Sequence, residues 1–364
     1  MRSIFSETVH YSLLTVHKNR GIFMSIIKQI QENYKTVSII GLAKNAGKTV
    51  ALNYLINKAS EENITIGITS TGRDGENSDL VTNTEKPTIF VTEGVLVATA
   101  KQALLISEAK VEILETTDLN TPMGEVVIVR VRHSGNIQIA GPSNAKDIKA
   151  ISNMLHDFGA KVVFVDGAID RKASSSPIIT DACIIATGAV LSRDIKKVIE
   201  KTAYMVECYQ LKEVQNNIRE KLIKGCSTCI VKDTGDIVCL DVKTGITAGK
   251  ILTEHIDETT QYVYVKGAIT SLLIKELSQN EYTKKFKLII DDATKIFVES
   301  RTWNEAKKRG LKIETLNSIN IVALTLNPVS PEGYYFDSAE FCEKMKYYIK
   351  GLNIIDVVSG GEVC

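Results

Sequence analysis

Runs of β-branched residues alternate with helical patterns along this chain from residue 36 onward. Residues 36–40 have the pattern of a buried strand, 50–58 that of a helix with one apolar face, and 64–69 that of a second strand. Strands joined by crossover helices lie parallel in one sheet, with the helices packed on its faces. The alternation therefore predicts an α/β fold with a parallel sheet flanked by helices.

The same reasoning predicts further elements between the second strand and residue 210. They are strands at 88–91, 161–166 and 182–186, helices at 99–109, 143–158 and 194–203, and an antiparallel pair formed by 125–132 and 136–140. Gly159 is placed to end the helix at 143–158, because glycine readily adopts the left-handed conformation that follows many helices.

A domain boundary is predicted near residue 211, where a charged helix and a hairpin around 233–236 interrupt the pattern. A chain of 364 residues exceeds the size at which one hydrophobic core usually stops growing. We therefore expect a first domain at 25–210 and a second, smaller α/β domain at 211–364. The second domain would hold strands at 262–265, 287–290, 319–324 and 354–358.

Residues 1–24 are expected to form a leader outside these domains. The ordered pattern begins directly after Met24, and the leader lacks the continuous apolar stretch of a signal peptide. It is therefore either disordered or not natively translated, with synthesis starting at Met24.

The charge balance argues against a nucleic-acid partner. The chain has 44 basic and 43 acidic residues, so no net field attracts a polyanion. No stretch approaches the roughly 18 uninterrupted apolar residues of a membrane-spanning helix. We therefore expect a folded protein that binds neither nucleic acid nor a membrane.

The cysteines indicate a reducing compartment. Seven are scattered through the chain, an odd number without a secretory signal, which is typical of reduced thiols and predicts a cytoplasmic location. Cys226 and Cys229 form one C-x-x-C segment, and Cys239 follows across the predicted hairpin. A structural zinc site needs four ligands, and the sequence has no matching second pair. Buried or half-buried thiols in the hairpin are therefore expected.

One strand-to-helix turn carries the residue types of a phosphate-binding loop. Residues 41–49 read Gly-Leu-Ala-Lys-Asn-Ala-Gly-Lys-Thr and lie between the predicted strand at 36–40 and the predicted helix at 50–58. The glycines allow turns that a side chain would block, so that backbone N–H groups point at a phosphate. This context predicts a nucleoside triphosphate site, and an ordinary strand-to-helix turn is the alternative.

The polar residues of this loop have predicted tasks. Lys48 supplies a positive charge between the β- and γ-phosphates, and the Thr49 hydroxyl coordinates Mg²⁺. Lys44 either adds a second charge near the phosphates or projects into solvent. The predicted contacts with the nucleotide come from Gly41, Lys44, Asn45, Ala46, Gly47, Lys48, Thr49 and Val50.

A phosphate loop also needs a carboxylate that holds the metal ion at the end of a neighbouring strand. Asp166 follows four apolar residues and is the predicted metal ligand and, with Lys48, the predicted catalytic residue. Capping of the next turn is the plainer alternative for Asp166. Asp74, in the polar loop after the second strand, is a further candidate for the metal. No Asn-Lys-x-Asp segment that would read guanine occurs, so ATP is favoured over GTP.

The order of these segments resembles the dethiobiotin-synthetase-like branch of P-loop proteins. Within residues 36–189 a strand, the loop at 41–49, a helix and a second strand precede a later strand that ends Asp166-Gly167-Ala168. The sequence departs from that branch after Ala168, where Ile169-Asp170-Arg171 replaces further glycines. This departure argues against a biotin precursor as the substrate.

A closer resemblance is to the ATPase-like subunit of the reactivating factor for lysine 5,6-aminomutase. It is carried by residues 41–49, 69–76 and 165–171 and spans the chain from Met24. The resemblance implies a role in lysine degradation, in which the subunit works with a MutS-like ATPase partner subunit. Together they would remove damaged cobalamin from the aminomutase client, using ATP.

Two other classes of function stay open. An ATP-dependent ligase or kinase of a small metabolite, resembling dethiobiotin synthetase, would use the second domain for its substrate. A P-loop regulator would bind nucleotide without turnover. Composition and residue spacing do not separate these classes, since they indicate only the nucleotide site.

Overall fold

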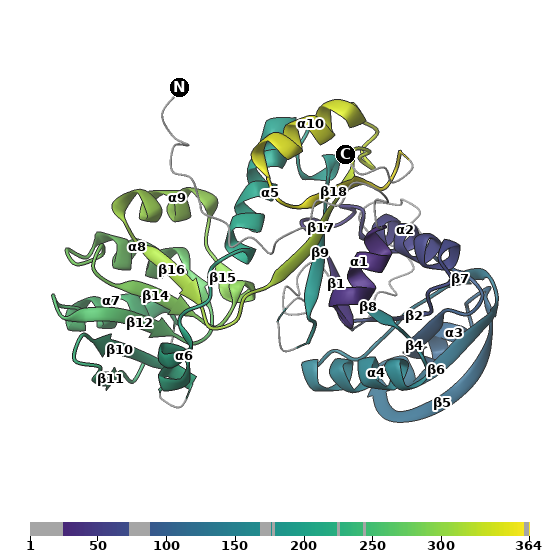
Figure 1. Ribbon diagram of the computed structural model, residues 1–364, viewed down its shortest axis with the longest axis horizontal. Helices are drawn as coiled ribbons and strands as arrows, with labels where there is room; N and C mark the ends of the chain where they lie inside the picture. Colours follow the sequence, from purple (N-terminus) through teal and green to yellow (C-terminus); the bar gives the residue numbers. More distant parts are fainter. Residues whose placement is uncertain are drawn as a thin grey trace.

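Helices cover both faces of a nine-stranded sheet, which forms the larger of two lobes (Figure 1). The computed structural model describes residues 25–72, 88–167, 176, 179–223, 226–242, 245–359 and 364. The strand order is β18 (Asn353–Asp356), β17 (Asn320–Asn327), β9 (Ala182–Gly188), β1 (Thr36–Gly41), β8 (Val162–Asp166), β2 (Ile66–Ser70), β4 (Leu96–Ala100), β6 (Gly124–His133) and β5 (Lys110–Thr121).

The strands from β18 to β4 in this order are parallel to their neighbours, whereas β6 pairs antiparallel with both β4 and β5. The prediction of an α/β fold with a sheet flanked by helices is confirmed. The sheet is mixed, however, and not parallel throughout. β5 and β6 are joined by a tight turn, and a direct return of this kind produces antiparallel strands.

Alternate residues of the central strands face opposite layers of helices. Phe164 of β8 packs with α1 and α2, whereas Val163 and Val165 pack with α4. Burial on both faces explains why these strands are continuous apolar runs. The helices of this lobe are α1 (Ile26–Asn33), α2 (Lys48–Glu61), α4 (Ala145–Asp157), α5 (Ile195–Tyr209), α10 (Ser338–Tyr348) and the 3-10 turn η2 (Ala189–Leu191).

Two local predictions for this lobe are wrong. Residues 99–109, predicted as one helix, hold the end of β4 and the short helix α3 (Lys101–Leu104). Residues 125–132 pair with β5 and not with 136–140, while β7 (Gly135–Ile137) pairs with β3 (Ile89–Val91). The partner strand β5 was not predicted, because its buried residues do not recur at every second position as they do in a typical strand.

The smaller lobe contains a five-stranded sheet. Its order is β11 (Ile237–Cys239), β10 (Thr228–Lys232), β12 (Thr260–Val265), β14 (Lys287–Ile290) and β16 (Lys312–Thr315). β10 and β11 form the predicted hairpin, and β12, β14 and β16 are parallel. The remaining elements are α6 (Asn216–Ile223), α7 (Gly245–His255), α8 (Ser271–Gln279), α9 (Ser300–Arg309), η3 (Ala293–Lys295) and the paired β13 (Ile269–Thr270) and β15 (Ile296–Phe297).

The chain leaves the larger lobe after α5 and returns to it at β17. β17 pairs with β9, and β18 then pairs with β17. The strand pairing therefore differs from the predicted division at residue 211, because 211–364 supplies strands to both sheets. The predicted leader, residues 1–24, lies outside the described residues.

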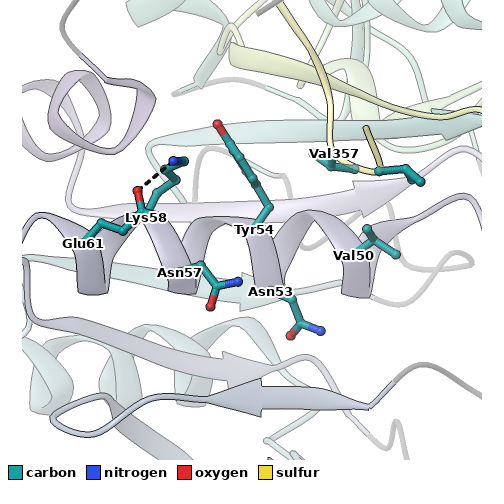
Figure 2. Close-up of a pocket in the computed structure, with 8 residues that line it drawn as sticks. Val50, Asn53, Tyr54, Asn57, Lys58, Glu61 and Val357 are labelled. Carbon is teal, nitrogen blue, oxygen red and sulfur yellow. Dashed lines mark hydrogen bonds and ion pairs between the residues drawn. The ribbon is translucent and has the colours of Figure 1, made fainter. Parts of the chain in front are cut away.

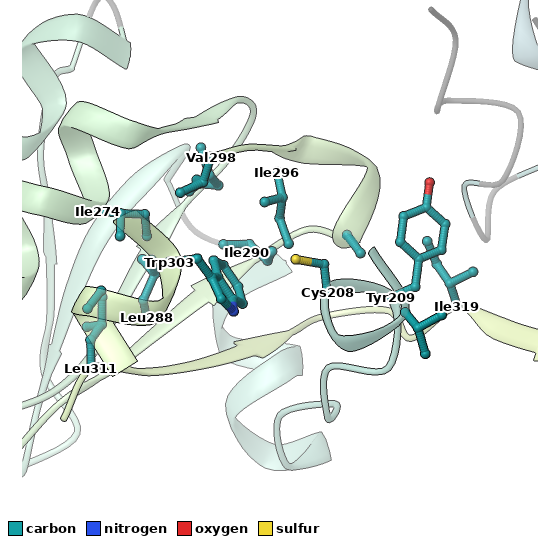
Figure 3. Close-up of a cluster of buried hydrophobic side chains, with 14 of the residues drawn as sticks. Cys208, Tyr209, Ile274, Leu288, Ile290, Ile296, Val298, Trp303, Leu311 and Ile319 are labelled. Atoms are coloured by element: carbon teal, nitrogen blue, oxygen red, sulfur yellow. The ribbon is translucent and has the colours of Figure 1, made fainter. Parts of the chain in front are cut away.

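One apolar cluster joins the two lobes. It contains Ile185 and Leu324 of the nine-stranded sheet together with Val263 and Leu288 of the five-stranded sheet. Figure 3 shows the part of this cluster around Trp303, where residues from the end of α5 approach those of the smaller lobe. The lobes thus share a hydrophobic core.

Four of the seven cysteines form disulfides, which corrects the expectation of reduced thiols throughout. Cys226 pairs with Cys239 across the hairpin, and Cys342 of α10 pairs with Cys364. Reduced thiols were the argument for a cytoplasmic location, and these four cysteines do not support that argument. None of the helices in the described ranges is long and apolar enough to cross a membrane.

A buried carboxylate holds the end of β18. The Asp356 side chain accepts hydrogen bonds from the N–H groups of Val358 and Ser359, at 2.8 and 2.9 Å, and from the Ser338 hydroxyl at the start of α10. Burial raises the pKa of this carboxyl, but the hydrogen bonds together outweigh burial and lower the pKa below its ordinary value. The stabilisation is therefore present above the unfolded pKa of about 3.9 and is lost as the pH falls through the lower folded value.

We expect the Asp356→Asn variant to lose less stability than the wild type between about pH 5 and pH 3, because it lacks this titration. Urea unfolding midpoints at the two pH values measure the difference. Asp118→Asn, at an exposed position of β5, is the control and should follow the wild type. The same loss of stability in Asp356→Asn and the wild type would show that Asp356 does not contribute to the acid sensitivity.

Candidate functional site

The carboxyl ends of β1, β8 and β2 meet at one edge of the nine-stranded sheet. β1 lies between β8 and β9, and the register pairs Ile39 with Asp166 and Gly41 with Ala186. α2, which follows β1, packs on one face of the sheet, and α5, which follows β9, packs on the other. The helices that follow these two neighbouring strands thus lie on opposite faces of the sheet. In α/β sheets such a change of face opens a crevice beyond the strand ends, where ligands bind.

The predicted phosphate loop lies at this edge. Gly47 has a φ of +102°, a left-handed conformation that favours glycine, and Asn45 has a φ of +61°. The N–H of Ala46 donates to the Ala43 carbonyl at 3.2 Å, which closes a turn before α2 begins at Lys48. The first N–H groups of a helix have no partner within the helix, so α2 presents donors and its positive end here.

Close packing, and not the predicted turn, favours glycine at position 41. No residue from 41 to 44 has a positive φ, but a Cβ at Gly41 would lie 3.0 Å from Lys48 Cγ and 3.1 Å from the Ala43 carbonyl oxygen. Five residues, 42–46, separate Gly41 from Gly47, one more than in the commonest phosphate loop. Leu42 stands where that loop has its first glycine, and its N–H donates to Ala186 at 3.0 Å.

The structure brings Lys48 and Asp166 together, as the sequence predicts. Lys48 Nζ lies 3.7 Å from Asp166 Oδ1 and donates a hydrogen bond to the Gly167 carbonyl. Only 12% of the Lys48 side chain and 3% of the Asp166 side chain are exposed. A shielded ammonium group therefore lies beside a carboxylate at the end of a neighbouring strand. This pair can contact a phosphate and a divalent cation at once.

The segment that follows β2 begins beside Asp166. The N–H of Thr71 donates to the Asp166 carbonyl at 2.9 Å, and the N–H of Gly167 donates to Ile39 at 3.0 Å. These bonds tie the ends of β2 and β1 to the end of β8. Asp74, three residues after Thr71, lies outside the described residues.

The remaining predicted contacts differ in exposure. Lys44 and Asn45 are exposed, Ala46 and Gly47 are buried, and Thr49 and Val50 are half-buried. Across the described part of the chain, no three His, Cys, Asp or Glu side chains are grouped to hold a metal ion. Of the predicted Mg²⁺ ligands, Thr49 and Asp166 lie within the described residues.

Asn327, at the end of β17, borders the loop and was not predicted from the sequence. A Cβ at Gly47 would lie 2.9 Å from Asn327 Cβ, and Asn327 pairs with Gly188 in the sheet. Its side-chain oxygen accepts the N–H of Val329 at 3.0 Å. The strand at 319–324 was predicted, but nothing in the sequence indicates that it lies next to β9. Asn327 could not be connected with the loop for that reason.

A pocket of about 310 Å³ lies between α2 and the end of β18 (Figure 2). It is lined by Val50, Asn53, Tyr54, Asn57, Lys58, Glu61, Val357 and Val358. Lys58 and Glu61 form an ion pair at 2.7 Å on its rim. The lining includes neither Lys48 nor Asp166, so this pocket is distinct from the site at the strand ends.

Comparison of the chain with models of known protein families, with curated proteins and with solved structures finds no match.

Proposed function

We propose that this chain is a P-loop ATPase that binds ATP and Mg²⁺ through residues 41–50. The observation that carries the proposal is the Lys48 ammonium group, held 3.7 Å from Asp166 Oδ1 at the start of α2. A helix N-terminus, a lysine and an adjacent carboxylate are the groups that a magnesium–triphosphate complex requires. The order of strand, loop and helix around Gly47 supports the same class of protein.

The residues at this site fit the transfer of a phosphoryl group to water. The N–H groups of the loop would orient the β-phosphate, and Lys48 would exchange the Gly167 carbonyl for a phosphate oxygen. Bound Mg²⁺ neutralises charge on the phosphates, and the Thr49 hydroxyl and Asp166 carboxylate are oxygen ligands of the kind that it prefers. Water attacks the γ-phosphorus as the bond to the β–γ bridging oxygen breaks, which gives ADP and phosphate.

We assign this activity to a reactivating factor for an adenosylcobalamin-dependent aminomutase. The assignment rests on the resemblance carried by residues 41–49, 69–76 and 165–171. ATP can shift a client complex between two states only when it binds those states with different affinity. The factor would therefore bind its client and its MutS-like partner subunit more tightly in one nucleotide state than in the other.

ATP hydrolysis measured in three samples tests this function: the chain alone, the chain with an inactivated aminomutase, and both with the partner subunit. We expect slow hydrolysis by the chain alone, and faster hydrolysis with release of damaged cobalamin in the complete mixture. Phosphorylation or ligation of a small metabolite would favour an enzyme similar to dethiobiotin synthetase. Binding of ATP without hydrolysis in any mixture would favour a regulator.

Asp166→Asn should raise the Mg²⁺ concentration needed for half-maximal ATP hydrolysis by roughly tenfold, because one charged oxygen contact is lost. The affinity for ATP without metal should change less. Asp181→Asn is a matched control, since Asp181 accepts the N–H groups of Lys35 and Thr36, at 2.9 and 3.0 Å, at the opposite end of β1. An unchanged Mg²⁺ requirement in Asp166→Asn would show that another acid, such as Asp74, binds the metal.

A further inference from the structure

Three of the seven cysteines lie together at the hairpin of β10 and β11. Cys239 of β11 forms a disulfide with Cys226, which precedes β10, and their Cα atoms are 5.6 Å apart. Cys239 is also the residue directly opposite Cys229 of β10 in the register of the two strands, and Cys229 is a free thiol. Cys239 therefore has a second cysteine beside it besides the one to which it is bonded.

The hydrogen bonds of the hairpin indicate how close Cys229 and Cys239 are. The N–H of Leu240 donates to the Thr228 carbonyl at 2.9 Å, so Thr228 and Leu240 form a hydrogen-bonded pair. In an antiparallel ladder the next pair along is not hydrogen-bonded, and its Cα atoms are about 4.5 Å apart with both side chains on one face. Disulfides span Cα separations of about 4.4–6.8 Å. The Cys229 thiol can therefore replace Cys226 as the partner of Cys239 while the two strands stay paired.

The three cysteines differ in their access to solvent. Cys239 is exposed and Cys226 is half-buried, whereas Cys229 is fully buried in the cluster in which α6 packs on the smaller sheet. Burial raises the pKa of the Cys229 thiol to about 11, so little of the nucleophilic thiolate is present near neutral pH. The free thiol is thus the protected one of the three, and exchange is slow as long as this cluster stays closed.

We propose that Cys226, Cys229 and Cys239 form a thiol–disulfide exchange site, in which Cys239 is the shared partner of the other two. The Cys229 thiolate attacks Cys239 Sγ, the bond between Cys226 and Cys239 breaks, and Cys226 leaves as a thiolate that takes up the proton lost by Cys229. This step consumes no oxidant and no reductant. It moves the free thiol from the buried Cys229 to the half-buried Cys226.

The released Cys226 thiol is the group that reacts with an outside substrate. The substrate is a small disulfide such as oxidised glutathione, which transfers one of its thiols to Cys226 as a mixed disulfide while the other half leaves as a thiolate. Cys229 is 0% exposed and does not meet such a substrate in its buried position. The internal exchange therefore decides whether a small disulfide can modify the smaller lobe.

Disulfide mapping of the full chain tests this site. The wild type is incubated with reduced and oxidised glutathione, denatured in acid with an alkylating reagent, and its peptides are identified by mass spectrometry. We expect two populations, one with the pair Cys226–Cys239 and one with the pair Cys229–Cys239. The alkylating reagent should be found on Cys229 in the first population, and the reagent or glutathione on Cys226 in the second. Absence of the Cys229–Cys239 pair from the wild type would overturn the proposal.

Two variants separate the two bonds. In Cys226→Ser, Cys239 should pair with Cys229, and at about 0.1 mM glutathione this pair should exceed the mixed disulfide of Cys239 by about tenfold or more, because tethered groups reach millimolar effective concentrations. In Cys229→Ser only the Cys226–Cys239 pair should form, and the uptake of glutathione by Cys226 should decrease. Cys183→Ala, which removes a buried thiol of β9, is the control and should give the wild-type map.

Circular dichroism checks that Cys226→Ser is folded. If the folded variant carries Cys239 only as a mixed disulfide with glutathione, Cys229 is out of reach and the proposal fails. If the variant does not fold, the map of the wild type decides. None of these measurements requires ATP, so their outcome is independent of the proposed function.

Discussion

Lys48→Ala is expected to weaken the binding of MgATP by about 10- to 100-fold while the fold remains intact. The variant loses one ammonium group, whose charge-assisted contacts with phosphate are worth about 1.5–3 kcal/mol. Lys48 belongs to none of the hydrophobic clusters of the described residues, so its removal leaves the apolar core unchanged. Calorimetric titration measures the affinity, and far-UV circular dichroism checks the fold.

Lys44→Ala provides the control for charge alone. Lys44 lies in the same loop but is exposed, and an exposed charge contributes at most about 1 kcal/mol, or roughly fivefold in affinity. Its removal should therefore have much less effect than that of Lys48. If Lys48→Ala binds MgATP as tightly as the wild type, the loop does not hold the triphosphate.

Trp303→Ala is expected to destabilise the protein by about 3–5 kcal/mol, the usual result of truncating a large aromatic side chain in a core. Trp303 is 1% exposed and belongs to the cluster that joins the lobes (Figure 3). Its ring meets Tyr204 of α5 edge-on, with centroids 6.1 Å apart, and its indole N–H donates to Glu207 at 2.8 Å. The variant thus loses apolar contacts and leaves a carboxylate without one of its donors.

Urea unfolding measured by circular dichroism gives the change in the free energy of unfolding. Trp303 is the single tryptophan of the chain, so its fluorescence in the wild type reports the same junction independently. Tyr347→Ala, at a side chain that is 71% exposed, is the control and should change stability by about 0.5 kcal/mol or less. A loss below about 1 kcal/mol in Trp303→Ala would contradict the view that the two lobes share one core.

The elements around the candidate site were predictable because their signals are local. Residues 36–40 are apolar enough for a strand buried on both faces, and the glycines and lysine that follow occur within one turn. Asp166 could be connected with Lys48 because both stand at the carboxyl ends of strands that were expected to lie parallel in one sheet. Such ends meet at the same edge whichever strands are neighbours.

Features that depend on distant pairing were not predictable. β17 pairs with β9 after more than a hundred intervening residues, and no local pattern distinguishes this from pairing within the smaller lobe. Because that pairing was not predictable, the approach of Asn327 to Gly47 was not predictable either. Cys342 and Cys364 likewise meet only because Cys364 lies beside β18, where its N–H donates to the Ile354 carbonyl. The edge strand β5 was missed for another reason, since a strand exposed to solvent needs no regular alternation of apolar residues.

A crystal structure of the protein with Mg²⁺ and a non-hydrolysable ATP analogue tests the nucleotide site itself. We predict that the β-phosphate lies against the N–H groups of residues 45–49, with Lys48 Nζ between the β- and γ-phosphates and the metal beside Thr49 and Asp166. Binding of the analogue in the pocket between α2 and β18, or the absence of any binding at millimolar concentration, would contradict the assignment of residues 41–50.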